Sequence, residues 1–339
     1  MPPKKQRTDS DTESITVFSN KTVDSAKIPP KPTNLGKKKD QNSKDFDFRL
    51  TFTNGVLLQK FLEPAAHAVQ KMRFVICQPA NATEFQGFKI ECVDQAFTLA
   101  DRGIFECDVQ GPKADGISFC VAADAFMEAL VSSTLRETDL SITRYTEDRV
   151  TFESTNNDND VRTVYTCNLI DSTSIDSLEG ITIELGFHVN VHMHTLKELS
   201  LNAKRCGATT LHFDLFQATD PSDKTIIHSK MRIGFVGTNT SGTHDFFIST
   251  RREATGDSVK WIPLTTSAGF DDTLKMEKKC SNEYDNNKLR LFLNHMDCQY
   301  VLVHLCTDNT IQPLVLEFTI GGSRTKHTVI VAPKETGAA

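Results

Sequence analysis

The chain has 339 residues, of which 38 % are hydrophobic and 24 % charged, and its formal net charge is −6 at pH 7. This length and composition allow two domains with sizeable cores. No run approaches the roughly 18 consecutive apolar residues of a membrane-spanning helix, and no early apolar segment indicates a secretory signal. The nine cysteines form no C-x-x-C pair, which favours reduced, buried thiols in an intracellular protein over a disulfide framework.

The first 45 residues differ in composition from the rest of the chain. Residues 1–44 carry ten basic and five acidic side chains, so they hold a net charge of +5 and leave −11 for residues 45–339. A segment this polar buries too little apolar area to offset its ordering entropy, so we expect a disordered basic tail over residues 1–45. Its lysine clusters are compatible with nuclear import, with loose DNA contacts, or with plain solvation.

From Asp47 onward the hydrophobic pattern alternates as in strands, with two helical stretches in the first half. Strands are expected over residues 48–52, 72–77, 88–92, 97–100, 104–109, 117–121, 140–145, 149–154 and 161–170. One helix is expected from Gly55, and a second over residues 124–135. The inward residues of the second helix are expected to be Phe126, Met127, Leu130 and Val131.

A polar stretch within residues 171–186 predicts an interdomain connector, after which the plan repeats. The second half is expected to contain strands over residues 187–192, 209–216, 231–236, 245–249, 274–278, 300–306 and 313–320, with helices over 195–206 and 285–296. In the first of these helices Leu196, Leu199 and Leu201 are expected to face inward, and residues 250–273 are expected to be irregular. Two copies of one plan predict a duplicated α+β fold, with domains at residues 46–170 and 187–335 and a tail at 336–339.

Three segments carry a family resemblance. They are TFTNGVLLQKFLEPAAHAV (51–69), CVDQAFTLA (92–100), and the C-terminal pair QPLVLEF (312–318) and TVIVAPKE (328–335). With the two-copy plan, these segments resemble the DNA sliding clamps of the PCNA family. The N-terminal tail and the long polar region 219–280 are typical of a divergent member, from a large DNA virus or a protist.

The resemblance implies two sliding-clamp domains with outer antiparallel sheets and two inner helices each. It also implies a non-enzymatic homotrimeric ring, without cofactor or metal, that encircles double-stranded DNA independently of sequence. Its expected partners are a DNA polymerase, other replication and repair factors with clamp-binding motifs, and a clamp loader. Its expected location is the nucleus or a viral replication site.

A ring of this kind needs positive charge on the helix faces that line its hole. The candidate DNA-binding residues are Lys60, Lys71, Arg73, Arg136, Lys197, Lys204, Arg205, Lys288 and Arg290. They lie on or just beyond the expected helices, so three of the four helices are expected to be net basic.

The resemblance also implies a pocket for partner motifs and a pair of subunit edges. The pocket residues are expected to be Phe97, Leu99, Leu178, Ile181, Pro313, Ile330, Ala332 and Pro333. The subunit interface is expected to involve Tyr165, Cys167, Phe247 and Ser249, on edge strands that pair head to tail.

Two alternatives remain open. The chain could be one subunit of a heterotrimeric checkpoint-type clamp or a clamp-fold viral transcription or replication factor. It could also be an enzyme with a Cys–His pair, which only the abundance of both residue types supports. His188, His192 and His194 alternate, but no other ligand lies at a supporting spacing, so no metal site is expected there.

Overall fold

A computed structural model describes the chain over residues 46–78, 85–94, 96, 99–111, 114–134, 139–146, 148–156, 161–171, 187–255, 258–263, 274–305, 313–320 and 325–334. Residues 44–339 form one compact unit. Within the described part of the chain, no helix combines the length and apolarity needed to cross a membrane.

The first half contains nine strands and two helices. They are β1 (Phe48–Phe52), α1 (Gly55–Ala68), β2 (Lys71–Cys77), β3 (Gly87–Val93), β4 (Leu99–Glu106), β5 (Asp108–Gln110), β6 (Ser118–Ala122), α2 (Ala123–Ser133), β7 (Asp139–Thr146), β8 (Arg149–Asn156) and β9 (Val161–Ile170). The α1 helix begins after Asn54, whose side chain accepts the backbone N–H of Leu57 as an N-cap.

The second half repeats this order of elements. It contains β10 (Phe187–His192), α3 (Met193–Arg205), β11 (Thr210–Thr219), β12 (Ile226–Val236), β13 (Ser241–Thr255), β14 (Ser258–Pro263), β15 (Glu277–Asp285), α4 (Asn286–His295), β16 (Tyr300–Leu305), β17 (Leu314–Thr319) and β18 (Lys326–Val331). Both halves therefore read as one strand, one helix, five strands, one helix and three strands, in agreement with the duplication that the sequence predicts.

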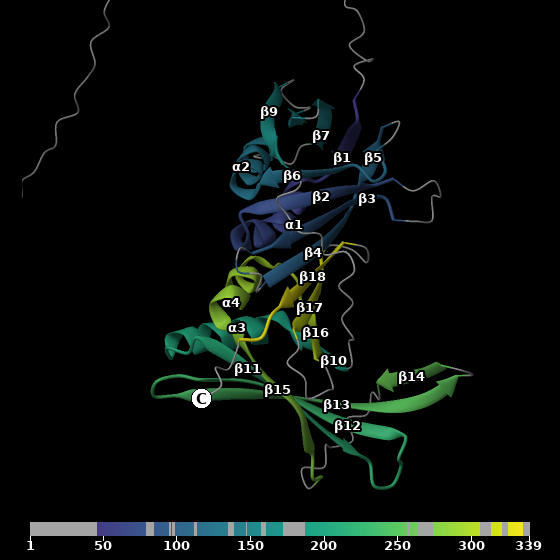
Figure 1. The fold of residues 1–339 in the computed structure, drawn as a ribbon, viewed down its shortest axis with the longest axis vertical. Helices are drawn as coiled ribbons and strands as arrows, with labels where there is room; N and C mark the ends of the chain where they lie inside the picture. Colours follow the sequence, from purple (N-terminus) through teal and green to yellow (C-terminus); the bar gives the residue numbers. More distant parts are fainter. Residues whose placement is uncertain are drawn as a thin grey trace, which may run out of the picture. The chain divides into compact units, whose positions relative to one another are not determined.

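All strand pairs are antiparallel, and they form two sheets (Figure 1). The larger has the order β10-β16-β17-β18-β4-β3-β2-β6-β9-β8-β7-β1-β5, and the smaller has the order β14-β13-β12-β11-β15. The larger sheet runs through both halves, since β18 of the second half pairs with β4 of the first. The halves are thus joined by continuous backbone hydrogen bonding.

The four helices form a row, in which α2 contacts α1, α1 contacts α4, and α4 contacts α3. They lie together on one side of the strands in Figure 1. Each helix buries one apolar stripe, such as Leu58, Phe61 and Leu62 of α1, against the sheets. The charged residues of α1, α2 and α3 lie off this stripe, whereas the exposed face of α4 is formed by Asn287, Leu291 and Asn294.

A buried polar contact lies at the junction between the halves. His327 of β18 and Asp101 of β4 are both fully buried, with His327 Nδ1 2.8 Å from a carboxylate oxygen of Asp101. The other ring nitrogen, Nε2, lies 2.8 Å from the carbonyl oxygen of Phe61, and the His327 ring stacks on the Phe61 ring. A single side chain therefore links β18, β4 and α1.

Gly103 makes room for this contact. It lies opposite His327 in the β4–β18 register, and a Cβ atom there would come within 2.6 Å of the Phe61 ring. A larger residue would displace Phe61 and the histidine stacked on it.

Several sequence-based expectations need correction. Val131 and Leu201 were expected to face inward, but both are 38 % exposed, because each lies at the margin of a narrower apolar stripe. Residues 250–273 were expected to be irregular, but β13 continues to Thr255 and β14 follows it as a hairpin. The strands expected at 97–100 and 104–109 are parts of one strand, β4, and a separate short strand, β5, while the strand expected at 274–278 lies later, at Glu277–Asp285.

Candidate nucleic-acid interface and subunit edges

The charge of the helix row is uneven. On α1, Lys60 is offset by Glu63, and α2 carries Asp124 and Glu128 with no basic residue. The helices of the second half, α3 and α4, each carry a net charge of +2. The expectation that three helices are net basic is therefore wrong for α1, because Lys71 and Arg73 lie in β2 and Glu63 lies inside the helix.

Three of the candidate DNA-binding lysines are engaged within the chain. Lys60 Nζ lies 2.8 Å from Asp297, and this hydrogen bond raises the pKa of Lys60 and lowers that of Asp297. Lys197 Nζ donates to the carbonyl oxygen of Met296 at 2.7 Å, at the end of α4. Lys288 Nζ lies 2.6 Å from Asp94, so this pair connects α4 to the end of β3.

Two of the other candidate arginines, Arg73 and Arg290, each have a buried Nε atom. Arg73 pairs with Glu91 across β2 and β3 at 3.3 Å, and its Nε is buried. The Nε of Arg290 is buried as well and has no hydrogen-bond partner among the described residues. Arg136 lies outside the described residues.

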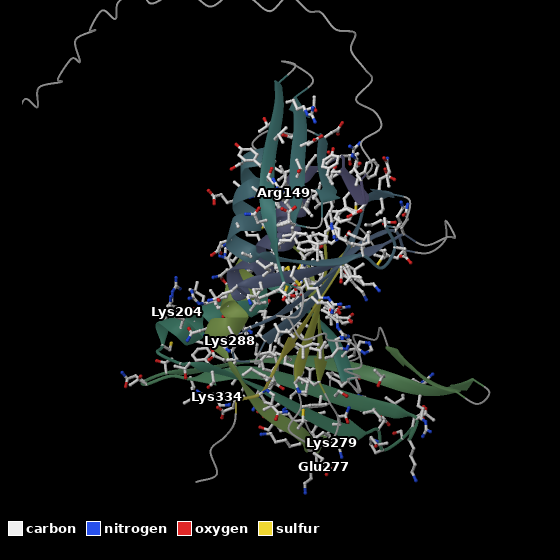
Figure 2. The ribbon with its side chains drawn as sticks, turned by 45° about the horizontal axis from the view of Figure 1, so that its top comes forward. Arg149, Lys204, Glu277, Lys279, Lys288 and Lys334 are labelled. Carbon is white, nitrogen blue, oxygen red and sulfur yellow. The ribbon has the colours of Figure 1, made fainter. Side chains whose placement is uncertain are left out.

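Lys204 and Arg205 are the most available cations of the row. Both are exposed in the last turn of α3, and neither forms an ion pair within the part of the chain that the structure describes. Figure 2 shows Lys204 at the end of α3, apart from Lys288. Lys71 is exposed too, but it begins β2 and does not belong to a helix. Free positive charge is thus concentrated at one end of the row.

The expected partner pocket is only partly described. Phe97, Leu178 and Ile181 lie outside the described residues. Ile330, Ala332, Pro333 and Pro313 are all half-buried, and Ile330 lies opposite Ala100 on the sheet face away from His327 and the helices.

Leu99 does not belong to this half-buried surface. It is 2 % exposed and part of the hydrophobic core, because it lies on the helix-facing side of β4. Its side chain is therefore not accessible to a partner.

Two strand edges are open. β9 pairs with β8 along its whole length but with β6 only at Leu169 and Ile170, which leaves the edge of residues 161–168 unpaired by the described strands. β13 pairs with β14 only from Thr250 onward, which leaves the edge of residues 241–249 without a partner among the described strands. Unpaired edges invite pairing with another chain.

The four expected interface residues lie on these two edges. Tyr165 is 38 % and Phe247 46 % exposed, and Ser249 is half-buried. Cys167 is buried at 3 % exposure, because its side chain faces the core, so only its backbone is at the edge.

Burial disfavours reactivity in six of the described thiols. It raises the pKa of Cys77, Cys92, Cys107, Cys120 and Cys167 above the ordinary value, and it raises that of Cys298 to about 11. A nucleophilic cysteine needs the opposite shift. We expect Cys298 to react with iodoacetamide at pH 8 at least tenfold more slowly than free cysteine, in a mass-spectrometric time course; an equal rate would contradict this.

Comparison with known proteins addresses the fold. No family model and no curated protein matches the sequence. A search of solved structures matches the crystal structure of Proliferating Cellular Nuclear Antigen from Entamoeba histolytica, with a TM-score of 0.59 and 14 % identity, over 85 % of this chain and 99 % of that chain. The chain has the sliding-clamp fold. The two-domain α+β architecture expected from the sequence is thereby confirmed, while the viral or protist origin stays a prediction.

Proposed function

We propose that the chain is a sliding clamp that closes into a ring around duplex DNA and tethers a polymerase and other replication or repair factors. The observation that carries the proposal concerns the strand pair that joins the two halves. This pair forms once within the chain, and the two equivalent strands elsewhere in the chain have unpaired edges. β4 of the first half pairs with β18 of the second half. The second-half counterpart of β4 is β13, and the first-half counterpart of β18 is β9; both have open edges. A second copy can supply the missing pairing.

The counterparts can be aligned residue by residue. Phe74 of β2 and Phe213 of β11 are both buried, and each lies three residues after the residue that pairs with the last strand position before α2 or α4. Following the cross-strand pairs outward from them leads to Gly103 of β4 and to His244 of β13. These two residues are therefore equivalent in the duplicated fold.

The other edge is aligned in the same way. Phe52 and Val191 are the last buried residues before α1 and α3, and the registers that start from them lead to Thr163 of β9 and to His327 of β18. Because His327 lies opposite Gly103 within the chain, Thr163 of one copy should lie opposite His244 of the next.

This register has a chemical consequence. It places Arg162 of one copy opposite Asp245 of the next, and both side chains lie on the exposed face of their strands. It also keeps Tyr165 on the same face as the half-buried Phe246. Repetition of one heterologous contact closes into a ring if the rotation fits. The resemblance to the PCNA family implies three subunits.

The chain's mass in solution tests ring closure. Multi-angle light scattering of the purified protein is expected to give three times 37.8 kDa. A monomer at micromolar concentration would overturn the homotrimer.

DNA contact should depend on the free charge of α3. Replacing Lys204 and Arg205 together by Glu should weaken binding to circular duplex DNA at least about tenfold. The slope of log K against log salt concentration should become shallower by about two per chain, because two phosphate contacts are lost. Binding can be measured by fluorescence anisotropy across a salt series.

The matched control reverses Lys224 and Arg252, which are also exposed but lie in the β11–β12 turn and on β13, not on the helix row. Equal losses in both double variants would show that general charge, and not the helix face, determines the binding.

We assign partner binding to the outer face of the β4–β18 junction. Ile330, Ala332 and Pro333 offer half-buried apolar surface beside the C-terminal end of the sheet. Such a surface fits the hydrophobic anchors of a short peptide motif.

One observation favours the heterotrimeric alternative. The acidic α2, with Asp124 and Glu128, contributes no positive charge to the helix row. A partner subunit with basic helices would compensate for it, and in that case the protein alone would not form a closed trimer.

A further inference from the structure

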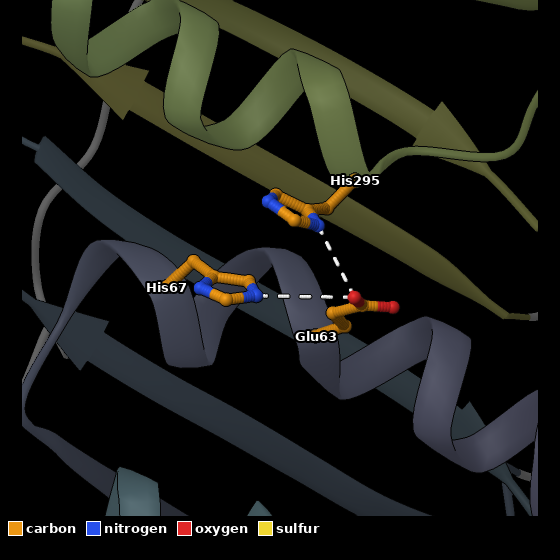
Figure 3. Close-up of side chains that lie close together, drawn as sticks. All are labelled: Glu63, His67 and His295. Atoms are coloured by element: carbon orange, nitrogen blue, oxygen red, sulfur yellow. Dashed lines mark hydrogen bonds and ion pairs between the residues drawn. The ribbon is translucent and has the colours of Figure 1, made fainter. Parts of the chain in front are cut away.

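A cluster of three potential metal ligands lies where α1 meets α4. Glu63 and His67 are four residues apart on α1, and His295 is the last residue of α4. One ligand atom from each residue lies within 4.8 Å of the others. Figure 3 shows both imidazole rings directed at the same carboxylate oxygen.

The distances fit a small divalent ion. Glu63 Oε1 lies 3.2 Å from His295 Nδ1 and 3.8 Å from His67 Nε2. A tetrahedral ion with ligand bonds of about 2.0–2.1 Å holds neighbouring ligand atoms about 3.3 Å apart. The three side chains have room to rotate toward this spacing, since Glu63, His67 and His295 are 35 %, 51 % and 29 % exposed.

The two imidazole rings lie stacked against each other. The centroids of His67 and His295 lie 3.9 Å apart and their planes differ by 23°. Because an imidazole nitrogen binds a metal ion in the plane of its ring, coordination by both rings requires one of them to turn out of the stack, which the partial exposure of both side chains permits.

The electrostatic surroundings favour a cation. His67 and His295 lie in the last turns of their helices, where the partial negative charge of the helix dipole stabilises positive charge. The positive charge of Lys60, one turn earlier on α1, is paired with Asp297 at 2.8 Å.

We propose that Glu63, His67 and His295 form a binding site for a divalent transition-metal ion of the Zn²⁺ class. Two imidazoles and one carboxylate suit Zn²⁺, Cu²⁺ or Ni²⁺, whereas Mg²⁺ and Ca²⁺ prefer oxygen ligands alone. The ion connects α1 of the first half to α4 of the second, so it stabilises the arrangement of the two halves in the helix row. The observations behind this site do not depend on DNA binding or on ring formation.

Metal binding to the full chain tests the proposal. After treatment with a chelator, the protein is titrated with Zn²⁺ against a chromogenic competitor, and its thermal unfolding is followed with and without Zn²⁺. We expect one histidine-dependent ion per chain and a rise in Tm of roughly 4 °C at a Zn²⁺ concentration about 100 times the Kd. Co²⁺ should give the visible spectrum of a tetrahedral site without thiolate charge-transfer bands, which excludes binding by cysteines.

Variants make the test specific. His67→Ala changes a half-exposed side chain, so it should fold normally, lose at least tenfold in Zn²⁺ affinity and lose the rise in Tm; His295→Ala should do the same. The matched control is His194→Ala on α3, since His194 and Glu198 form a similar pair four residues apart, at 3.3 Å, that belongs to no such three-residue cluster in the described part of the chain. Unchanged Zn²⁺ affinity and an unchanged rise in Tm in His67→Ala would overturn the proposal, as would an equal loss in His194→Ala.

Discussion

Replacing His327 by Phe is expected to lower the free energy of unfolding by about 3–5 kcal/mol. The variant retains a ring that can stack on Phe61 but leaves the Asp101 carboxylate fully buried without its partner. A buried charge that loses its partner keeps its desolvation cost. Urea unfolding followed by circular dichroism measures the change.

A double-mutant cycle measures the interaction between His327 and Asp101. Asp101→Leu alone should cost a similar amount, while the double variant should lose much less than the sum, because no buried polar group is then left unpaired. His188→Phe is the control at an exposed strand position and should stay within about 0.5 kcal/mol of the parent. Additive losses in the double variant would show that His327 and Asp101 do not act as a pair.

The second large effect concerns ring closure. Arg162→Asp should shift the trimer to monomers at micromolar concentration, because it places acidic residues of one copy, including the nearby Glu153, opposite Asp245 of the next. Even a penalty of about 1.4 kcal/mol per interface weakens each contact tenfold, and a closed trimer has three such contacts. Sedimentation velocity measures the distribution of species.

A compensating charge reversal tests the proposed register between β9 of one copy and β13 of the next. Adding Asp245→Arg to Arg162→Asp should restore much of the trimer, although Asp245 also forms a two-bond contact with Arg232, at 2.7 and 2.9 Å, which the substitution removes. Arg149→Asp is the control, since Arg149 is similarly exposed but lies on β8, an inner strand that is paired with β7 and β9. A trimer that persists in Arg162→Asp, or a monomer that the second substitution does not rescue, would contradict this register while leaving other forms of ring closure possible.

Both effects arise at pairings between segments far apart in sequence. β4 and β18 are separated by more than half of the chain, and Asp101 lies 226 positions from His327. Hydrophobic patterns in the sequence indicate where the strands lie, but they carry no information on which distant strands and side chains pair. For the same reason the cluster of Glu63, His67 and His295 was not expected, although the i, i+4 spacing of Glu63 and His67 was a signal available in the sequence.

The sequence by itself determined the duplicated order of strands and helices, because hydrophobic periodicity is a local property that many different residues can satisfy. Chain periodicity located all four helices within two residues of their observed starts. It could not show which charged side chains are free, since that depends on neighbours brought together by folding. Only the tertiary structure paired Lys60 with Asp297 and Lys288 with Asp94, left Lys204 and Arg205 available, and exposed the edges of β9 and β13.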